Sequence, residues 1–218
     1  MNNRIGVFFV LLLALISCGK DKLEVIPVVV VYGNYSALDT NNFWVYEHFS
    51  LDTNGALLSL NQFDSVYVEK DTTWNDKRYF KVIQKDYDNG GVLVAKYMRD
   101  SSGYTIDSAG TIILATVNLG TTLKQYVQYG TNVSDTFAQV SAQVIAETVM
   151  DSTPVGKFQT INYKTTYVMG NNYQQGGKTR YVSNKYADKV GLVYKTLPFN
   201  YANSNYEVLL LSKYGKTK

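Results

Sequence analysis

The sequence predicts an all-β protein whose strands form an antiparallel meander, either closed into a barrel or curled into a half-barrel. Tyrosine occurs 19 times, and valine and threonine are also frequent; these residues favour a pleated, half-buried surface. Short runs of alternating apolar and polar residues recur along the chain, and each is followed by Gly, Asn, Asp or Ser. No convincing amphipathic helix interrupts this pattern, so strands joined by tight turns are expected throughout.

The predicted strands follow one another at short spacing. In order, they cover residues 43–49, 65–69, 78–84, 92–98, 104–107, 111–117, 137–150, 158–168, 178–184, 191–196 and 207–213. Asn54-Gly55 and Asn75-Asp76 are typical of tight hairpin turns, which need a positive φ. Residues 121–136 are less regular, and we interpret them as a longer connection.

Two of these segments need separate justification. Residues 137–150 fit a helix by length and by Ala and Gln content, but their alternation fits a strand, and we favour the strand. The clearest strand is 158–168, in which Ile161, Tyr163 and Tyr167 share one face. No linker or exact repeat divides the chain after the N-terminal region, so residues 39–218 are expected to form a single β domain. A long meander exposes its edges unless it curls, and its outline is then similar to lipocalins and lipoprotein carriers.

The N-terminal residues indicate export. Arg4 precedes an apolar run over residues 5–16, which is typical of a signal peptide and short for a transmembrane span. The following Leu15-Ile16-Ser17-Cys18 resembles the lipobox of bacterial lipoproteins. This resemblance implies that residues 1–17 are removed and that Cys18 carries lipid, including palmitate, which anchors the chain to a membrane. Gly19 lacks the acidic side chain of the inner-membrane retention signal, so the resemblance implies the outer membrane, on either its periplasmic or its outer side.

Residues 18–38 are then expected to be the lipidated cysteine and a tether. Residues 24–32 are apolar for a tether, and they form either a first strand or a segment lying against the domain or the membrane.

The mature part carries a second resemblance. Residues 154–158 read Pro-Val-Gly-Lys-Phe, and residues 186–193 read Tyr-Ala-Asp-Lys-Val-Gly-Leu-Val. They are similar to a Pro-x-Gly-x-Phe turn and a Tyr-Ala-x-x-Val-Gly-Leu-Val element of uncharacterised β-rich bacterial lipoproteins, although Val155 replaces the usual Ala. The resemblance implies a barrel-like fold and assigns no activity. Physically, the two glycines suit turns, while Phe158, Leu192 and Val193 suit a core.

The residue inventory argues against most catalytic chemistry. Cys18 is the single cysteine, so the domain is expected to have no disulfide and no thiolate site. His48 is the single histidine, which argues against zinc. It alternates with Trp44 and Tyr46, and we interpret it as a strand residue that is hydrogen-bonded or faces solvent. No metal or cofactor is therefore expected, and a formal net charge of +3 does not indicate nucleic-acid binding.

Two acidic features were candidates for chemistry. Residues 86–91 resemble a calcium loop but lack the EF-hand ligands at the required positions, so a hairpin turn is the better interpretation. A pair of carboxylates would support a glycan-directed hydrolase, because such pairs are set by three-dimensional spacing. The candidates are Glu47, Glu69, Asp86 and Glu147.

Tyrosines crowd the C-terminal third, and we select Tyr163, Tyr167, Tyr181 and Tyr194 as candidate ligand-binding residues. Tyrosine provides contact area at low entropic cost together with a hydrogen bond, although ordinary sheet packing explains the same pattern. The sequence therefore favours a non-enzymatic binding module for an apolar or amphipathic small ligand. The alternatives are a structural or interaction subunit of a cell-envelope assembly and the hydrolase.

Overall fold

The computed structural model of the chain describes residues 32–52, 54–85, 90–91, 93–131, 135–172, 178–197 and 206–217. The predicted signal peptide, Cys18, residues 19–31 and Asp86 lie outside these residues. Within them every regular element is a strand, as predicted. The strands are β1 (Asn42–Leu51), β2 (Leu57–Trp74), β3 (Lys77–Lys85), β4 (Leu93–Ser101), β5 (Tyr104–Asp107), β6 (Ile112–Ala115), β7 (Thr122–Tyr129), β8 (Thr136–Ala146), β9 (Asp151–Thr153), β10 (Gly156–Phe158), β11 (Thr160–Met169), β12 (Thr179–Ala187), β13 (Gly191–Thr196) and β14 (Tyr206–Lys216).

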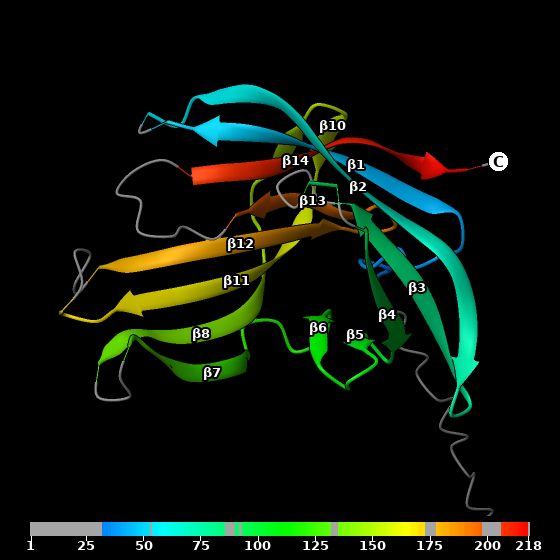
Figure 1. Cartoon of the computed structure of the whole chain (residues 1–218), viewed down its shortest axis with the longest axis horizontal. Coiled ribbons are helices and arrows are strands. Elements are labelled where there is room, and N and C mark those ends of the chain that lie inside the picture. The colour runs from blue at the N-terminus through cyan, green and yellow to red at the C-terminus, as the bar shows by residue number, and fades with distance from the viewer. Residues whose placement is uncertain are drawn as a thin grey trace, which may run out of the picture. The chain divides into compact units, whose positions relative to one another are not determined.

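Twelve of these strands form one antiparallel sheet (Figure 1). Its order is β6-β5-β4-β3-β2-β1-β14-β13-β12-β11-β8-β7, and β9 and β10 form a separate hairpin. Most neighbours are consecutive in sequence, but β1 pairs with β14 over its whole length. The first and last strands therefore meet in the middle of the sheet and join its two halves.

The sheet is open, so of the two predicted forms the half-barrel describes it and the closed barrel does not. Its edge strands are β6 and β7, which are not hydrogen-bonded to each other. The sheet nevertheless curls enough for side chains to bridge the halves, because Leu114 of β6 packs in one buried cluster with Val144 of β8 and Ile161 of β11. This curl creates an inner face, on which the core lies.

Alternation along the central strands explains how the core forms. In β1 the side chains of Trp44, Tyr46 and His48 are buried, while the residues between them are only partly buried. The main core cluster combines Trp44 and Tyr46 with residues of the neighbouring strands and of the N-terminal segment. Its buried members are Ala37, Leu38, Trp44, Tyr46, Val68, Val82, Ala187, Val193, Leu209 and Leu211.

The structure corrects the prediction for residues 121–136. These residues contain a strand, β7, which pairs with β8 from Thr122 to Tyr129. Only Leu123 in β7 is partly buried, and its other residues are exposed, so the strand lacks the apolar alternation by which strands are recognised. The strand prediction for residues 137–150 is confirmed over Thr136–Ala146.

Two boundaries also differ from the predictions. The predicted strand over 158–168 is interrupted at Gln159, between β10 and β11, because the β9–β10 hairpin leaves the main sheet. By its contacts, Tyr32–Lys218 forms one compact unit. Ala37 and Leu38, which we placed in the tether, are buried in the core, because the segment that carries them packs across the inner face of the sheet.

Candidate functional site

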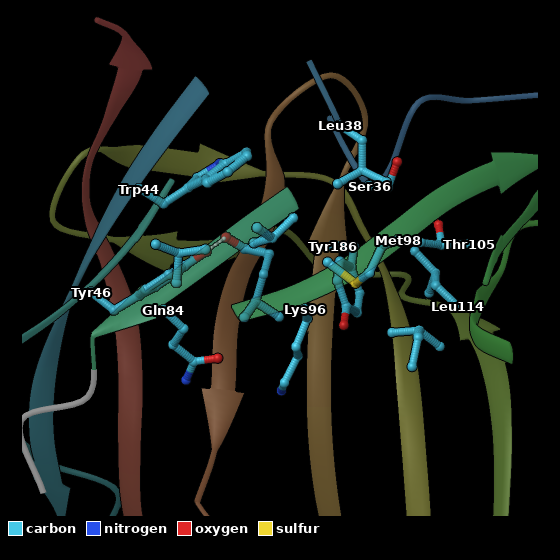
Figure 2. A pocket seen from close by; sticks show the side chains of 14 residues that line it. Ser36, Leu38, Trp44, Tyr46, Gln84, Lys96, Met98, Thr105, Leu114 and Tyr186 are labelled. Carbon is cyan, nitrogen blue, oxygen red and sulfur yellow. Dashed lines mark hydrogen bonds between the residues drawn. The ribbon is translucent and has the colours of Figure 1, made fainter. Parts of the chain in front are cut away.

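A cavity of about 210 Å³ opens on the inner face of the sheet (Figure 2). It lies between the β1–β6 half, the β12–β13 hairpin and the N-terminal segment. The lining residues are Ser36, Leu38, Trp44, Tyr46, Val66, Val82, Gln84, Lys96, Met98, Thr105, Ile113, Leu114, Tyr186 and Leu192. Most of these side chains are apolar, so the wall suits an apolar group.

Strand register explains why these residues share the cavity. Trp44 pairs with Val66 across β1 and β2, and Val66 pairs with Gln84 across β2 and β3. Val82 pairs with Lys96 across β3 and β4. Directly paired residues point to the same face of a sheet, so each strand contributes alternate side chains to one wall.

Two aromatic side chains form the back of the cavity, and their polar atoms are satisfied by backbone. The Trp44 Nε1 atom donates to the Val190 carbonyl at 2.6 Å, and the Tyr46 hydroxyl donates to the Leu192 carbonyl at 3.1 Å. Gly191 has a φ of 95°, and a Cβ there would lie 3.2 Å from Trp44 Nε1, so the turn approaches the indole closely. Burial raises the pKa of Tyr46 well above its ordinary value of 10.0.

The N-terminal segment, residues 32–38, covers one end of the cavity. Its Asn34 N–H donates to Asp188 at 2.6 Å, and the Lys189 N–H donates to the Asn34 carbonyl at 2.8 Å. On the other side, Asp100 accepts hydrogen bonds from Ser36 at 2.6 Å and from Thr105 at 2.9 Å. The segment therefore bridges the turn between β12 and β13 and the C-terminal end of β4. Its irregular backbone leaves no periodic signal in the sequence by which it could be predicted.

The opposite end of the cavity is polar. Gln84 and Lys96 extend from β3 and β4 away from Ser36 and Leu38, and the Tyr186 hydroxyl points in the same direction (Figure 2). Burial, followed by the influence of Tyr163, raises the pKa of Tyr186 to about 12. The hydroxyl therefore remains protonated at neutral pH and is available as a donor.

The four predicted ligand-binding tyrosines do not converge. Tyr163 and Tyr167 pair with the buried Val144 and Val140 and lie on the inner face. Tyr181 lies on the opposite face, where the Lys164 Nζ atom is 3.9 Å from its ring centroid. Tyr194 is paired with Lys185, also on that face.

None of these four tyrosines lines the cavity. The tyrosines that do are Tyr46 and Tyr186. Two sequence features could have pointed to them: the alternation in β1 for Tyr46, and the Tyr-Ala-Asp-Lys-Val-Gly-Leu-Val element that begins at Tyr186.

His48 lies beside the core, between two carboxylates. Its side chain is 1% exposed, its Nε2 atom is 3.1 Å from Asp64 Oδ1, and its Nδ1 atom hydrogen-bonds Glu207. The hydrogen-bonded alternative is thus confirmed and the solvent-facing one is wrong. Burial alone lowers the pKa of His48, but the hydrogen bonds and charges of Glu207 and Asp64 outweigh it and raise the pKa above 6.5. With a carboxylate at each ring nitrogen, His48 is not placed to activate a serine.

The candidate carboxylates have structural contacts outside the cavity. Glu47 accepts a hydrogen bond from Ser59, and Glu69 forms an ion pair with Lys81 at 2.7 Å. Glu147 accepts from Asn162 at 2.7 Å and lies 3.7 Å from Lys185, which also binds Asp151 at 2.6 Å. This last network fastens the β9–β10 hairpin to the sheet. None of the three glutamates lines the cavity.

The described residues contain no group of His, Cys, Asp or Glu side chains arranged to hold a metal ion. No helix in this part of the chain is long and apolar enough to cross a bilayer.

Comparison with known proteins shows a similarity of fold and assigns no activity. No protein-family model matches the chain, and no curated protein matches it. A solved structure from Bacteroides fragilis, described as an exported protein with a YmcC-like fold, aligns with a TM-score of 0.50 and 13% identity, over 86% of this chain and 100% of that one. A second, described as a lipoprotein from Parabacteroides distasonis, aligns with a TM-score of 0.43 and 15% identity, over 85% of this chain and 100% of that one. The all-β fold of this chain is thus similar to the YmcC-like fold.

Proposed function

We propose that this protein is a lipid-anchored, non-enzymatic binding module of the bacterial outer membrane that holds a small apolar or amphipathic ligand. The observation that carries the proposal is the apolar cavity under residues 32–38, whose aromatic wall has its polar atoms satisfied by backbone. Small closed β-barrels hold one such ligand in their interior, and the inner face of this half-barrel offers a comparable concave wall. The lipobox supports the anchor, and the exported protein of similar fold agrees with a location in the cell envelope.

Cavity size limits the ligand. An engineered protein cavity of roughly 150 Å³ holds benzene, and drug-sized ligands occupy pockets of about 300 Å³ or more. A volume of about 210 Å³ lies between these limits. The ligand portion that enters the cavity is therefore a short alkyl chain or a single ring.

Tryptophan fluorescence provides a test of the cavity. The chain has two tryptophans, and Trp74 is 54% exposed on the β2–β3 hairpin while Trp44 lines the cavity. In the full chain carrying Trp74→Phe, held in lipid nanodiscs, 1-octanol is expected to change Trp44 emission in a saturable way. Adding Val66→Phe fills the cavity and should weaken this binding by about tenfold or more, since ligand and phenyl ring compete for one volume.

The matched control is Val168→Phe, which makes the same substitution at a side chain that is 42% exposed on β11. It should leave the titration unchanged. A linear, unsaturable response, or equal curves for the two phenylalanine variants, would contradict a ligand site in the cavity. The thermal midpoint of each variant, measured in parallel, separates blocked binding from loss of fold.

Lipid attachment is tested at Cys18. Cys18→Ser is expected to abolish incorporation of labelled palmitate and to leave the chain as precursor, because the thioether needs the cysteine sulfur. Ser17→Ala keeps a small residue before the cleavage point and should be lipidated normally. Mass spectrometry of the envelope fraction measures both outcomes, and labelled, anchored Cys18→Ser protein would refute the proposed anchor.

A second candidate function is docking to another envelope protein. Edge strands offer unpaired backbone groups for the addition of a further strand. The observation that favours this candidate is β7, an edge strand that exposes Tyr126, Val127 and Tyr129 by 40%, 41% and 50%. If the cavity binds no ligand, docking through β7 becomes the favoured function.

A further inference from the structure

We propose that the ligand carries an anionic head group, which binds Lys96 and Tyr186 at the polar end of the cavity. This inference rests on the proposed ligand-binding role of the cavity and adds the charge of the ligand. It assigns the ligand to the class of short-chain anionic amphiphiles, represented by an alkyl carboxylate.

The charge on the described cavity lining is positive. Among the described residues that line the cavity, Lys96 is the only charged one and none is acidic. The nearby carboxylate is Asp100, and its two oxygens accept hydrogen bonds from Ser36 and Thr105. A cationic head group would therefore meet Lys96 without a neutralising partner, whereas an anion would complete an ion pair.

The polar end also offers donors without protein partners. Among the described residues Lys96 forms no ion pair, and the Tyr186 hydroxyl forms no hydrogen bond. Tyr186 keeps its proton at neutral pH, because burial holds its pKa at about 12. An ammonium and a phenolic hydroxyl can both donate to one carboxylate, and charge-assisted hydrogen bonds of this kind are stronger than neutral ones.

The covered end of the cavity carries the hydroxyl of Ser36, which is hydrogen-bonded to Asp100, but no charged side chain of the described lining. Leu38 and Trp44 lie toward the covered end, and Lys96 and the Tyr186 hydroxyl point away from it (Figure 2). An alkyl chain that enters tail first would place its head group beside these donors. Scaled from benzene in an engineered cavity, the volume accommodates roughly eight carbon atoms, which makes octanoate a suitable probe.

The experiment compares octanoate with 1-octanol at pH 7.5, using the full chain in nanodiscs with Trp74→Phe and Trp44 as the reporter. Lys96→Gln is expected to weaken the binding of octanoate by about two- to fivefold, which is the range that a solvent-accessible ion pair contributes. The affinity for 1-octanol should not change. Raising the salt concentration should reduce the octanoate preference, because exposed charges are screened.

Two further variants make the result specific. Lys77→Gln removes an exposed lysine from β3, outside the cavity lining, and should leave both affinities unchanged. Lys96→Glu should reverse the preference, so that octylamine binds more tightly than octanoate. Titrations are corrected with empty nanodiscs, because both probes partition into lipid.

The outcomes separate the two proposals. Saturable binding of both probes with equal affinity, or an octanoate preference that survives Lys96→Gln, overturns the anionic head group and leaves the ligand-binding role intact. Absence of a saturable response to either probe overturns the ligand-binding role itself. Loss of the octanoate preference in Lys96→Gln but not in Lys77→Gln supports the inference.

Discussion

Replacing His48 with leucine is expected to lower the free energy of unfolding by about 3–5 kcal/mol near pH 6. The imidazole bridges the centre of the sheet, because His48 lies on β1, Asp64 on β2 and Glu207 on β14. Asp64 is only 5% exposed, so the substitution leaves a buried carboxylate beside a leucine. Urea denaturation followed by circular dichroism measures the loss.

The double variant His48→Leu/Asp64→Leu tests the cause. Replacing both members of a buried pair with apolar residues is far less costly than removing one, so the double variant should recover much of the stability. Lys216→Leu is the surface control, because its ion pair with Asp39 is exposed to solvent and such pairs contribute little to stability. A double variant as unstable as the single one would show that the buried charge is not the source of the loss.

The effect of His48 should also depend on pH. The folded-state pKa of His48 lies above its ordinary value of 6.5 because the carboxylates outweigh burial. A raised pKa contributes stability that is complete below about pH 6.5 and is lost as the pH rises through the folded-state value. The difference between wild type and His48→Leu should therefore shrink from pH 5.5 to pH 8.5, and a difference that grows with pH would contradict the charged pair.

Leu211→Ala is expected to destabilise the domain by about 2–5 kcal/mol. Leu211 is fully buried on β14, opposite Tyr46 in the pairing with β1, and it belongs to the main core cluster. Truncation removes apolar contacts and leaves a void where the two halves of the sheet meet. Thermal and urea unfolding should report the same loss.

The matched control is Leu58→Ala, at a leucine that is 70% exposed on β2. Exposed substitutions of this kind usually change stability by about 0.5 kcal/mol or less. Similar losses for Leu211→Ala and Leu58→Ala would mean that β14 does not organise the core. A larger loss for Leu211→Ala would show that the meeting of the first and last strands holds the half-barrel together.

Most of the fold was predictable because strand alternation is local information. The strand over residues 43–49 and the turn at Asn75-Asp76 appear as expected, and the turn residues have φ values of 50° and 56°. The edge strand β7 was missed, because it buries too little to alternate. The burial of Ala37 and Leu38 was missed as well, since irregular backbone is positioned by distant partners such as Asp188 and Asp100.

The candidate site was less predictable than the fold. Tyrosine abundance directed attention to Tyr163, Tyr167, Tyr181 and Tyr194, but abundance does not say which face of a curved sheet a residue occupies relative to a cavity. Tyr46 and Tyr186 lie 140 positions apart in the chain, and they share the cavity only because β14 connects the two halves of the sheet.

By itself, the sequence determined the all-β class, most of the strands, the hairpin turns and the resemblance of Leu15–Cys18 to a lipobox, because each depends on residues close together in the chain. Only the tertiary structure decided that the sheet stays open, that His48 lies between Asp64 and Glu207, and that Lys96 and Tyr186 face one apolar cavity. The physical reason is that these features depend on strand order and on the curl of the sheet. Both arise from long-range pairing, for which local alternation carries no information.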